Sequence, residues 1–429
     1  MQDSILYVLR ALVITWVTTT VAHAQLTVDI KGIGSNRHPI AVANFKNIND
    51  STHTLIVDIV RADLTSSGRF IQVPVEGQII GENDMVSLSS WQTKGANSLI
   101  TGSVTKRENG TYDVKFRLYD IIHQQSLGGL SITATSENLR LTAHKIADYV
   151  YQKLLGDRGI FSTRLSYVVR TGNIYQLQIS DSDGKNAKIA MNSLEPLISI
   201  AWAPDGRKIA YVSFERQKPI IYIHDLPTGN RTVLANEKGN NSAPSWAPDG
   251  KTLAIALSRD GNTSVYSVNA QGGNFNRLSI GNNIDTEPQF SPDGKWIYFT
   301  SDRGGSPQIY RMPSEGESES AATRITFKGN YNVSPRLSPD GKLLAYISRQ
   351  GDGYKLTTQN LISGDVINLT DSDQNESPSF SANSKHILYA TKVNGRKNIA
   401  TVSVDGYVRK TFSIRGDEVR EPSWGPFTQ

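Results

Sequence analysis

A five-residue motif recurs six times between residues 202 and 428, and its regular spacing constrains the fold more than any other feature of this chain. Each of the first four copies has an apolar residue, then Ala or Ser, then Pro-Asp-Gly, and the last two copies are degenerate. The copies begin at Trp202, Trp246, Phe290, Leu337, Phe380 and Trp424, which lie 44, 44, 47, 43 and 44 residues apart. Repeats of this length indicate one supersecondary unit that is used several times.

Each unit continues in the same way after its motif. An alternating run such as residues 208–213 predicts a strand, a polar turn such as 302–305 follows, and a second run such as 309–312 predicts the next strand. Pro-Asp-Gly suits a tight turn, because Pro presets φ and Gly accepts a positive φ. Four short strands per unit, repeated six times, predict an all-β six-bladed β-propeller.

The ends of the repeat region predict how the ring closes. The sixth copy supplies only a first strand, near residues 422–424, whereas the strand-like runs at 164–170 and 174–179 have no motif before them. Residues 164–427 number 264, which is six units of 44. We therefore expect the C-terminal strand to pair with the run at 164–170, so that the sheet ring has no free edge.

The segment before the repeats has a different pattern. Residues 39–45, 98–105 and 111–119 read as strands, and 138–155 reads as an amphipathic helix with Leu139, Ala143, Ile146, Val150 and Leu154 on one face. Residues 54–64 also have helical spacing, carried by Leu55, Ile59 and Ala62. The expected organisation is an N-terminal α/β domain (25–160), a linker at 156–159, and the propeller (161–429).

The first 24 residues read as a secretory signal. An apolar stretch of twelve residues from Ala11 is followed by Ala22-His23-Ala24, a small-x-small cleavage site, so we expect a mature N-terminus at Gln25. The alternative is a membrane anchor, but a span needs about 20 apolar residues, and this stretch contains four Thr. The sequence therefore predicts an exported protein rather than an integral membrane protein.

Composition excludes several classes of function. The chain has no Cys, which rules out disulfides, Cys-ligated zinc, Fe–S clusters, thiol nucleophiles and a lipidated N-terminal Cys. Lys and Arg total 45 against 40 Asp and Glu, and they form no basic run of the kind a nucleic-acid groove needs. We expect no nucleic-acid partner.

Motifs for catalysis, metals and cofactors are not found. The chain lacks a Gly-x-Ser-x-Gly elbow, and its His residues are not spaced as zinc pairs. Residues 249–252 resemble the end of a P-loop and 181–184 an acidic calcium loop, but both lack the remaining motif residues and read as turns. We expect no catalytic residue, no metal and no cofactor.

The propeller geometry predicts where a partner could dock. The innermost strands of a propeller run along its channel, so the residues that enter them surround one opening. The residues three before each motif start are Ser199, Ala243, Glu287, Ser334, Ser377 and Glu421. Loops carry function when a partner exists, but these residues can equally be solvated turn residues.

Residues 25–33 alternate as an edge strand does, with Leu26, Val28 and Ile30 on one side. Such a strand can pair with a sheet edge on a partner, or it can dock on this chain and exchange between bound and free states. It can also be an ordinary first strand of the α/β domain. The sequence leaves these interpretations open.

The signal, the α/β segment and the six Pro-Asp-Gly blades together resemble the TolB family of the Gram-negative Tol–Pal envelope system, over the whole mature chain. More specific than the blade motif are residues 26–33, Pro39-Ile-Ala-Val42, Gly68-Arg-Phe70 and Asn283-Ile-Asp-Thr-Glu-Pro288. The fifth motif copy departs from the pattern, since it reads Ser381-Ala-Asn-Ser384, and this makes its turn doubtful.

The resemblance implies a periplasmic, non-enzymatic, monomeric scaffold that maintains outer-membrane integrity and invagination at cell division. Its implied partners are the lipoprotein Pal and the protein TolA, within a complex that includes TolQ and TolR. The expected Pal-binding residues are Asn240, Asn241, Ala243, Asp285, Thr286, Glu287, Asn332, Glu376 and Glu421. The expected TolA-binding residues are Gln25, Leu26, Thr27, Val28, Asp29 and Ile30. The competing class is an exported propeller enzyme, a lyase or glycosidase, which would need a cluster of acids, His or a metal in the channel.

Overall fold

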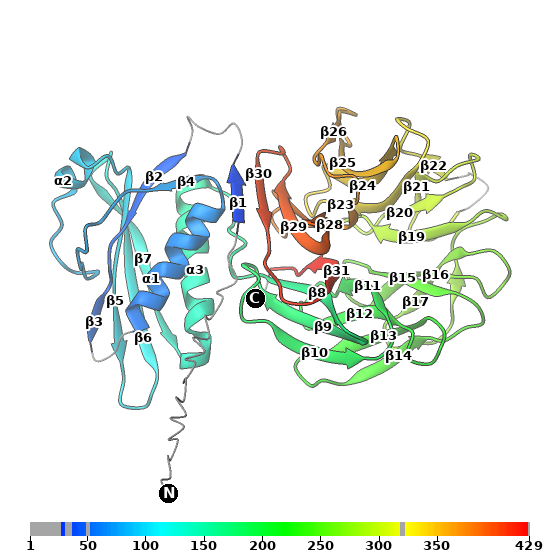
Figure 1. Cartoon of the computed structure of the whole chain (residues 1–429), viewed down its shortest axis with the longest axis horizontal. Helices are drawn as coiled ribbons and strands as arrows, with labels where there is room; N and C mark the ends of the chain where they lie inside the picture. The colour runs from blue at the N-terminus through cyan, green and yellow to red at the C-terminus, as the bar shows by residue number, and fades with distance from the viewer. Residues whose placement is uncertain (1–26, 31–36, 49–51, 318–321, 428–429) are drawn as a thin grey trace, which may run out of the picture.

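The computed structural model describes residues 27–30, 37–48, 52–317 and 322–427. It consists of an N-terminal α/β region followed by a six-bladed β-propeller, which lie side by side in Figure 1. The expected signal at 1–24 lies outside the described residues, as do Gln25 and Leu26 of the expected TolA-binding segment. Within the described part of the chain, no helix is long and apolar enough to cross a membrane.

The α/β region has one mixed sheet in the order β4-β2-β5-β6-β7, with β3 paired to β5. β2 is parallel to β4 and β5, whereas β5, β6 and β7 are antiparallel. The strands are β2 (His38–Val42), β3 (Lys46–Ile48), β4 (Phe70–Gln72), β5 (Ser98–Lys106), β6 (Tyr112–Asp120) and β7 (Gln125–Ala134). The helices are α1 (Thr52–Ser66), α2 (Leu88–Thr93), the 3₁₀ helix η1 (Ser136–Asn138) and α3 (Leu139–Leu155).

The two long helices bury apolar faces against one side of this sheet. The predicted face of α3 is confirmed, because Leu139, Ala143, Ile146 and Val150 are buried and Leu154 packs beside them. The helix predicted at 54–64 is confirmed as α1, but only Ile59 of the three residues that carried its spacing is buried. Leu55 and Ala62 are exposed, and the buried positions are Ile56, Val57, Ile59, Val60, Asp63 and Leu64.

The six predicted blades are present, each an antiparallel sheet that starts at the channel. The first blade is β31 (Glu418–Trp424), β8 (Arg164–Thr171), β9 (Ile174–Asp181) and β10 (Lys188–Ser193). The second is β11 (Leu197–Trp202), β12 (Lys208–Ser213), β13 (Ile220–Asp225) and β14 (Arg231–Ala235). The third is β15 (Asn241–Trp246), β16 (Thr252–Leu257), β17 (Ser264–Asn269) and β18 (Asn276–Arg277).

The remaining three blades repeat the same order. The fourth is β19 (Asp285–Phe290), β20 (Trp296–Ser301), β21 (Gln308–Pro313) and β22 (Thr323–Arg324). The fifth is β23 (Asn332–Leu337), β24 (Leu343–Gln350), β25 (Gly353–Asn360) and β26 (Val366–Asn368). The sixth is β27 (Glu376–Phe380), β28 (His386–Val393), β29 (Arg396–Ser403) and β30 (Val408–Thr411).

The motif forms the turn between the first two strands of a blade. In the second blade the N–H of Gly206 donates to Ala203 O (2.9 Å) and Gly206 has φ +66°, which Gly adopts at no steric cost. The Asp205 carboxylate accepts the N–H of Arg207 at 2.8 Å. The degenerate fifth copy forms the same turn, because Ser384 takes the Gly position at φ +63° and its N–H donates to Ser381 O (2.9 Å).

The expected closure of the ring is confirmed. β31 pairs antiparallel with β8, with Trp424 opposite Leu165 and Glu418 opposite Arg170. Trp424 is 8% exposed, and its indole N–H donates to Thr163 Oγ1 at 2.8 Å. Trp202 and Trp246 likewise donate to backbone carbonyls of a neighbouring blade, so these rings pack between blades as expected.

The segment β1 (Thr27–Ile30) does not join the sheet of the α/β region. It pairs antiparallel with β30 and becomes a fifth strand on the outer edge of the sixth blade. Figure 1 shows it between the two parts of the molecule. The interpretation of this segment as an ordinary first strand of the α/β domain is therefore wrong.

Candidate functional site: the channel mouth and the domain interface

Every blade has a β-bulge in its innermost strand, at the same place relative to the motif. In all six strands, the pairing with the next strand shifts register between the fourth residue before the motif and the residue directly before it. Five of the six bulges contain a Pro, which has no N–H to lose from the ladder at that point. The bulges therefore follow from a second repeated pattern, which lies a few residues upstream of the first.

The residue at the centre of each bulge has a left-handed backbone. The φ values are +56° at Ser199, +52° at Ala243, +53° at Glu287, +58° at Ser334, +50° at Ser377 and +52° at Glu421. None of these residues is Gly, and each such conformation costs about 1 kcal/mol or more. Strain stored six times at equivalent positions is typical of a functional surface rather than of a plain turn.

The six bulge residues surround a cavity of about 270 Å³ on the propeller axis. This arrangement is the ring expected from their spacing. The charged residues among the described lining are Glu287, Arg336 and Glu421. The cavity can therefore offer hydroxyl groups, two carboxylates and one guanidinium to a ligand or partner.

Both carboxylates tie one blade to another. Glu287 accepts hydrogen bonds from the N–H (2.8 Å) and the hydroxyl (2.6 Å) of Ser334, and from Thr300 Oγ1 (2.8 Å). Glu421 accepts the N–H of Ser199 at 2.7 Å. Burial raises the pKa of Glu421, and burial lowers the pKa of Arg336. The charges at the mouth are thus held by neighbouring strands.

Three of the expected Pal-binding residues point into their own blade. Asn241 is fully buried and bonds the backbone of Glu237, with Glu237 N–H to Asn241 Oδ1 at 2.8 Å. Asp285 accepts two bonds from Arg303, and Asn332 donates to Gln308 Oε1 and Lys328 O. These three side chains therefore stabilise the loops at the mouth, and a partner would contact the loops rather than the side chains themselves.

The other expected residues are accessible to a partner. Asn240, Ala243, Thr286, Glu287, Glu376 and Glu421 are partly exposed, at or beside the bulges.

The sequence analysis did not single out Asn375, which is 2% exposed and donates to the carbonyls of Tyr354 and Ser372. Its position five before the motif, shared with Asn241, Asp285 and Asn332, was the signal that could have found it.

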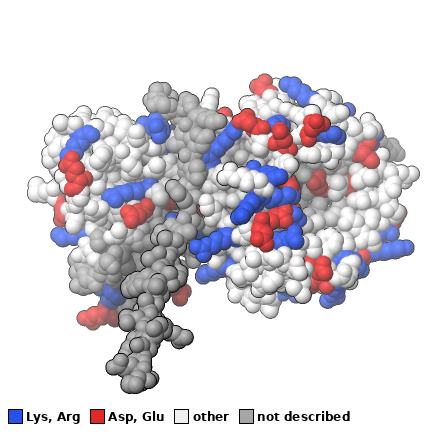
Figure 2. Space-filling view, in the orientation of Figure 1, with Lys and Arg blue, Asp and Glu red and all other residues white. Residues whose placement is uncertain are grey.

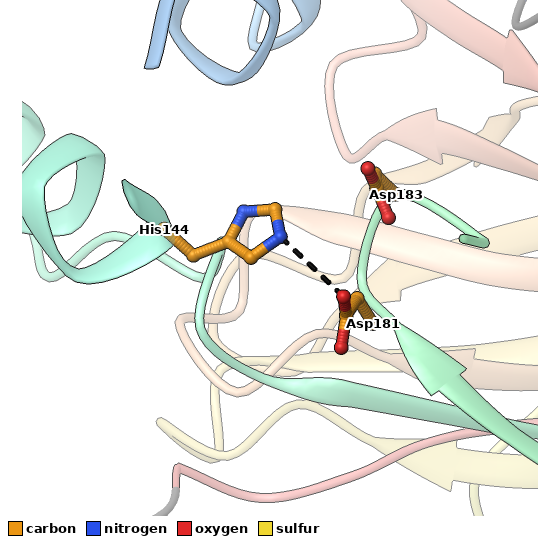
Figure 3. A group of neighbouring side chains, drawn as sticks. All are labelled: His144, Asp181 and Asp183. Carbon is orange, nitrogen blue, oxygen red and sulfur yellow. Dashed lines mark ion pairs between the residues drawn. The ribbon is translucent and has the colours of Figure 1, made fainter. Parts of the chain in front are cut away.

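A second group of polar residues lies between the α/β region and the propeller. His144 of α3 faces Asp181, the last residue of β9, and Asp183 in the following turn (Figure 3). His144 Nδ1 is 2.6 Å from Asp63 Oδ2 of α1, and both residues are buried. The sequence analysis interpreted residues 181–184 only as a turn. Asp63, His144 and Asp181 are too far apart in the sequence to form a motif.

These residue types can bind a metal, but Arg140 already pairs with both propeller carboxylates. Its Nε lies 3.0 Å from Asp181 Oδ2 and its terminal nitrogen 2.8 Å from Asp183 Oδ2. The group therefore has the composition of an ion-pair network.

On the face of the molecule shown in Figure 2, acidic and basic side chains are intermixed over the propeller.

Comparisons with known proteins agree with both parts of the fold. A family model described as the TolB amino-terminal domain matches residues 26–127, and one described as the TolB beta propeller domain matches residues 151–428. The crystal structure of TolB from Acinetobacter baumannii is 38% identical, with a TM-score of 0.85, over 94% of this chain and 100% of that chain.

More distant structures share the propeller fold alone. A chain of the nidogen/laminin complex has 12% identity and a TM-score of 0.50, over 62% of this chain and 100% of that chain. The hydrazine synthase of Kuenenia stuttgartiensis has 12% identity and a TM-score of 0.50, over 61% of this chain and 46% of that chain. The two matching domain models and the Acinetobacter structure cover nearly the entire chain, and the chain therefore belongs to the TolB family.

Proposed function

We propose that this protein is a non-enzymatic periplasmic scaffold of the Tol–Pal system, which binds Pal at the channel mouth and TolA through its N-terminal segment. It would thereby help to maintain the outer membrane and its invagination at division, in a complex that includes TolQ and TolR. The observation that carries the proposal is the ring of six strained bulge residues, because it gives a chain of this family one distinctive, partly exposed surface.

The chemistry of the mouth favours binding over catalysis. Of the charged residues that line the described cavity, Glu287 is held by Ser334 and Thr300, and Glu421 by Ser199. Each carboxylate is therefore occupied in joining blades, whereas a glycosidase needs a carboxyl pair free to exchange protons and attack. Titration against Pal beside a panel of hydrolase and lyase substrates separates the scaffold from the enzyme.

The Pal surface is tested by adding bulk and charge at the mouth. A double substitution, Ala243→Arg with Thr286→Arg, should weaken Pal binding at least tenfold without lowering the melting temperature by more than a few degrees, because both side chains are partly exposed. Calorimetry with Pal gives the affinity. Unchanged affinity would exclude this site.

A matched control places the same charges at the other end of a blade. Gln271 and Asn274 are exposed in the turn between β17 and β18, where the chain lies beside the motif turn. Gln271→Arg with Asn274→Arg should leave Pal binding unchanged. An equal loss in both double variants would show a general charge effect instead of a site.

The TolA segment is tested by deletion of residues 25–32. β1 adds only four paired residues to the edge of an existing blade, so its loss should change the melting temperature little. TolA binding should disappear while Pal binding stays. A large loss of thermal stability would show that the segment is structural, and retained TolA binding would refute its role. Mass spectrometry of the exported protein tests the expected start at Gln25.

A further inference from the structure

The group between the two parts of the molecule joins charges from three separate segments. His144 and Arg140 come from α3, Asp63 from α1, and Asp181 and Asp183 from the first blade. Figure 3 draws three of them, His144, Asp181 and Asp183. His144 is 1% exposed and Asp63 3%, so solvent does not screen their attraction as it does at a surface. The pairs that cross between the α/β region and the propeller are Arg140 with Asp181 and Asp183, and His144 with Asp181.

Both ring nitrogens of His144 face a carboxylate. Nδ1 lies 2.6 Å from Asp63 Oδ2, and Nε2 lies 3.7 Å from Asp181 Oδ2. A neutral imidazole has one N–H and one lone pair, so one of its nitrogens would present a lone pair to an anion. An imidazolium presents an N–H to each carboxylate. The geometry therefore favours the protonated ring.

The surrounding charges also require that proton. Three carboxylates, Asp63, Asp181 and Asp183, face two basic side chains, Arg140 and Lys410 of β30, and burial lowers the pKa of Lys410. A protonated His144 makes the group neutral, and buried charges are stable only when they are paired. Two further charges lie near. Lys185 is beside Lys410, and Asp148 of α3 accepts the N–H groups of Phe161 and Ser162.

We propose that the His144 group is a proton-dependent latch between the α/β domain and the propeller, closed while His144 is protonated and weakened when it loses that proton. The group also contacts the segment just after the linker, because Ser182, between the two propeller carboxylates, donates to Phe161 O at 2.7 Å. It reaches β30 through Lys410, and β30 is the strand on which β1 lies. The inference does not depend on the proposed function.

The direction of the pH dependence follows from the pKa. Burial by itself lowers the pKa of His144, but the charge of Asp63 and the contacts with Asp181 and Asp63 outweigh it and raise the pKa to about 10. A group whose pKa is raised on folding contributes its full stability below its unfolded pKa, about 6.5. That contribution decreases as the pH rises from about 6.5 towards 10. Asp63 stays beside His144 in the separated α/β domain, so docking raises the pKa of His144 only through Asp181 and Asp183. The docking constant should therefore fall as the pH rises towards 10, by less than tenfold per pH unit.

The test uses the full mature chain labelled at two exposed positions. The chain has no Cys, and Met85 of the α/β domain and Ile362 of the propeller are 103% and 82% exposed, so Met85→Cys with Ile362→Cys accepts a fluorophore pair without disturbing packing. Energy transfer then reports separation of the two domains in denaturant at pH 7, 8 and 9. Histidine NMR on the same chain reports the protonation state of His144.

The comparison is between His144→Gln and a matched control, His123→Gln. His123 forms the same kind of pair with Asp120, at 2.7 Å, but its side chain is 70% exposed. In the wild type and in His123→Gln, the constant for domain separation should rise several-fold per pH unit. In His144→Gln the domains should separate more readily at pH 7, with a pH dependence below about twofold per unit.

Two results would overturn the latch. One is a neutral His144 at pH 8 in the NMR spectrum of the unmodified chain, a measurement that needs no variant to fold. The other is an equal pH dependence of domain separation in His144→Gln and the wild type. If His144→Gln does not fold, Asp181→Asn removes one carboxylate from the propeller side, and it should reduce the same pH dependence.

Discussion

The channel mouth and the domain interface both contain charged side chains that hold separate segments together, but the two sites are built in different ways. At the mouth, equivalent residues from six blades meet on an axis, and the carboxylate of Glu287 is satisfied by hydrogen bonds from the next blade. At the interface, His144 lies between Asp63 of the α/β region and Asp181 of the first blade, a meeting of segments that occurs once in the described chain. The mouth is formed by equivalent residues of repeated blades, whereas the interface is formed by one contact between two different domains.

The difference explains how each site depends on its surroundings. Repetition places six bulges with the same backbone geometry, so the loss of one side chain leaves the ring in place. The interface has no such redundancy, because each charge there balances another. We therefore expect substitutions at the interface to cost more stability than similar substitutions at the mouth, and loss of the ring closure to cost most.

The largest effect is expected from deletion of residues 420–429. The deletion removes most of β31, leaves the N–H and C=O groups of β8 unpaired, and exposes the pocket of Trp424. Loss of one buried Trp alone costs about 3–5 kcal/mol, a large part of the stability of a domain. The melting temperature should fall by more than about 10 °C in calorimetry.

A milder variant sharpens this test. Trp424→Phe keeps an aromatic ring between the blades but loses the N–H that donates to Thr163 Oγ1. It should lower the free energy of unfolding by about 1–2 kcal/mol. A deletion no more harmful than Trp424→Phe would mean that the ring is not held by β31.

An intermediate effect is expected when a charge is removed from the interface. Asp63→Asn leaves the buried His144 without its nearest counter-ion, and breaking a buried pair costs about 3 kcal/mol or more. Glu287→Gln at the mouth keeps one accepting oxygen for Ser334 and should cost about 1 kcal/mol. Denaturant unfolding at pH 7 compares the two.

The pH dependence provides a second readout for this pair of variants. The charge of Asp63 is the largest of the influences that raise the pKa of His144, so Asp63→Asn should lower that pKa. The alkaline loss of stability should therefore be smaller and end at a lower pH in Asp63→Asn, and it should not change in Glu287→Gln. If Asp63→Asn and Glu287→Gln lower the free energy of unfolding equally and have the same pH dependence, the two sites do not differ in the way described.

The smallest effect on stability is expected at the degenerate fifth motif copy, which contacts the linker between the two domains. Asn383 accepts the N–H of Lys385, as Asp does in other copies, but its Nδ2 also donates to Arg158 O in the linker at 3.0 Å. Asn383→Asp restores the common motif and should destabilise by about 1 kcal/mol, because a carboxylate cannot donate to that carbonyl. Thermal unfolding measures the change.

The reciprocal substitution is the control. Asp340→Asn in the preceding copy keeps an oxygen to accept the N–H of Lys342, and Asp340 makes no described hydrogen bond to the linker. Its effect should stay within about 0.5 kcal/mol. If both substitutions have the same effect, the departure from the motif has no role in joining the linker to the propeller.

The sequence was sufficient for the features that depend on local periodicity. The six blades, the closure through Trp424 and the ring of residues at the mouth all follow from a fixed spacing, because equal units must place equal residues at equal positions. The buried face of α3 followed from apolar spacing for the same reason. In α1 only Ile59 of the three residues with the expected spacing is buried, because apolar residues on two adjacent sides of the helix, such as Leu55 and Ile56, offer more than one regular spacing.

Only the tertiary structure decided what depends on contacts between distant segments. Asp63, His144 and Asp181 are separated along the chain, and no spacing rule relates them until α1, α3 and the first blade are packed together. The placement of β1 on β30 is likewise a choice between sheet edges that its alternating pattern leaves open. Periodicity determines what a repeated unit becomes, whereas the pairing of single segments depends on which surfaces and charges remain to be satisfied once the units have folded.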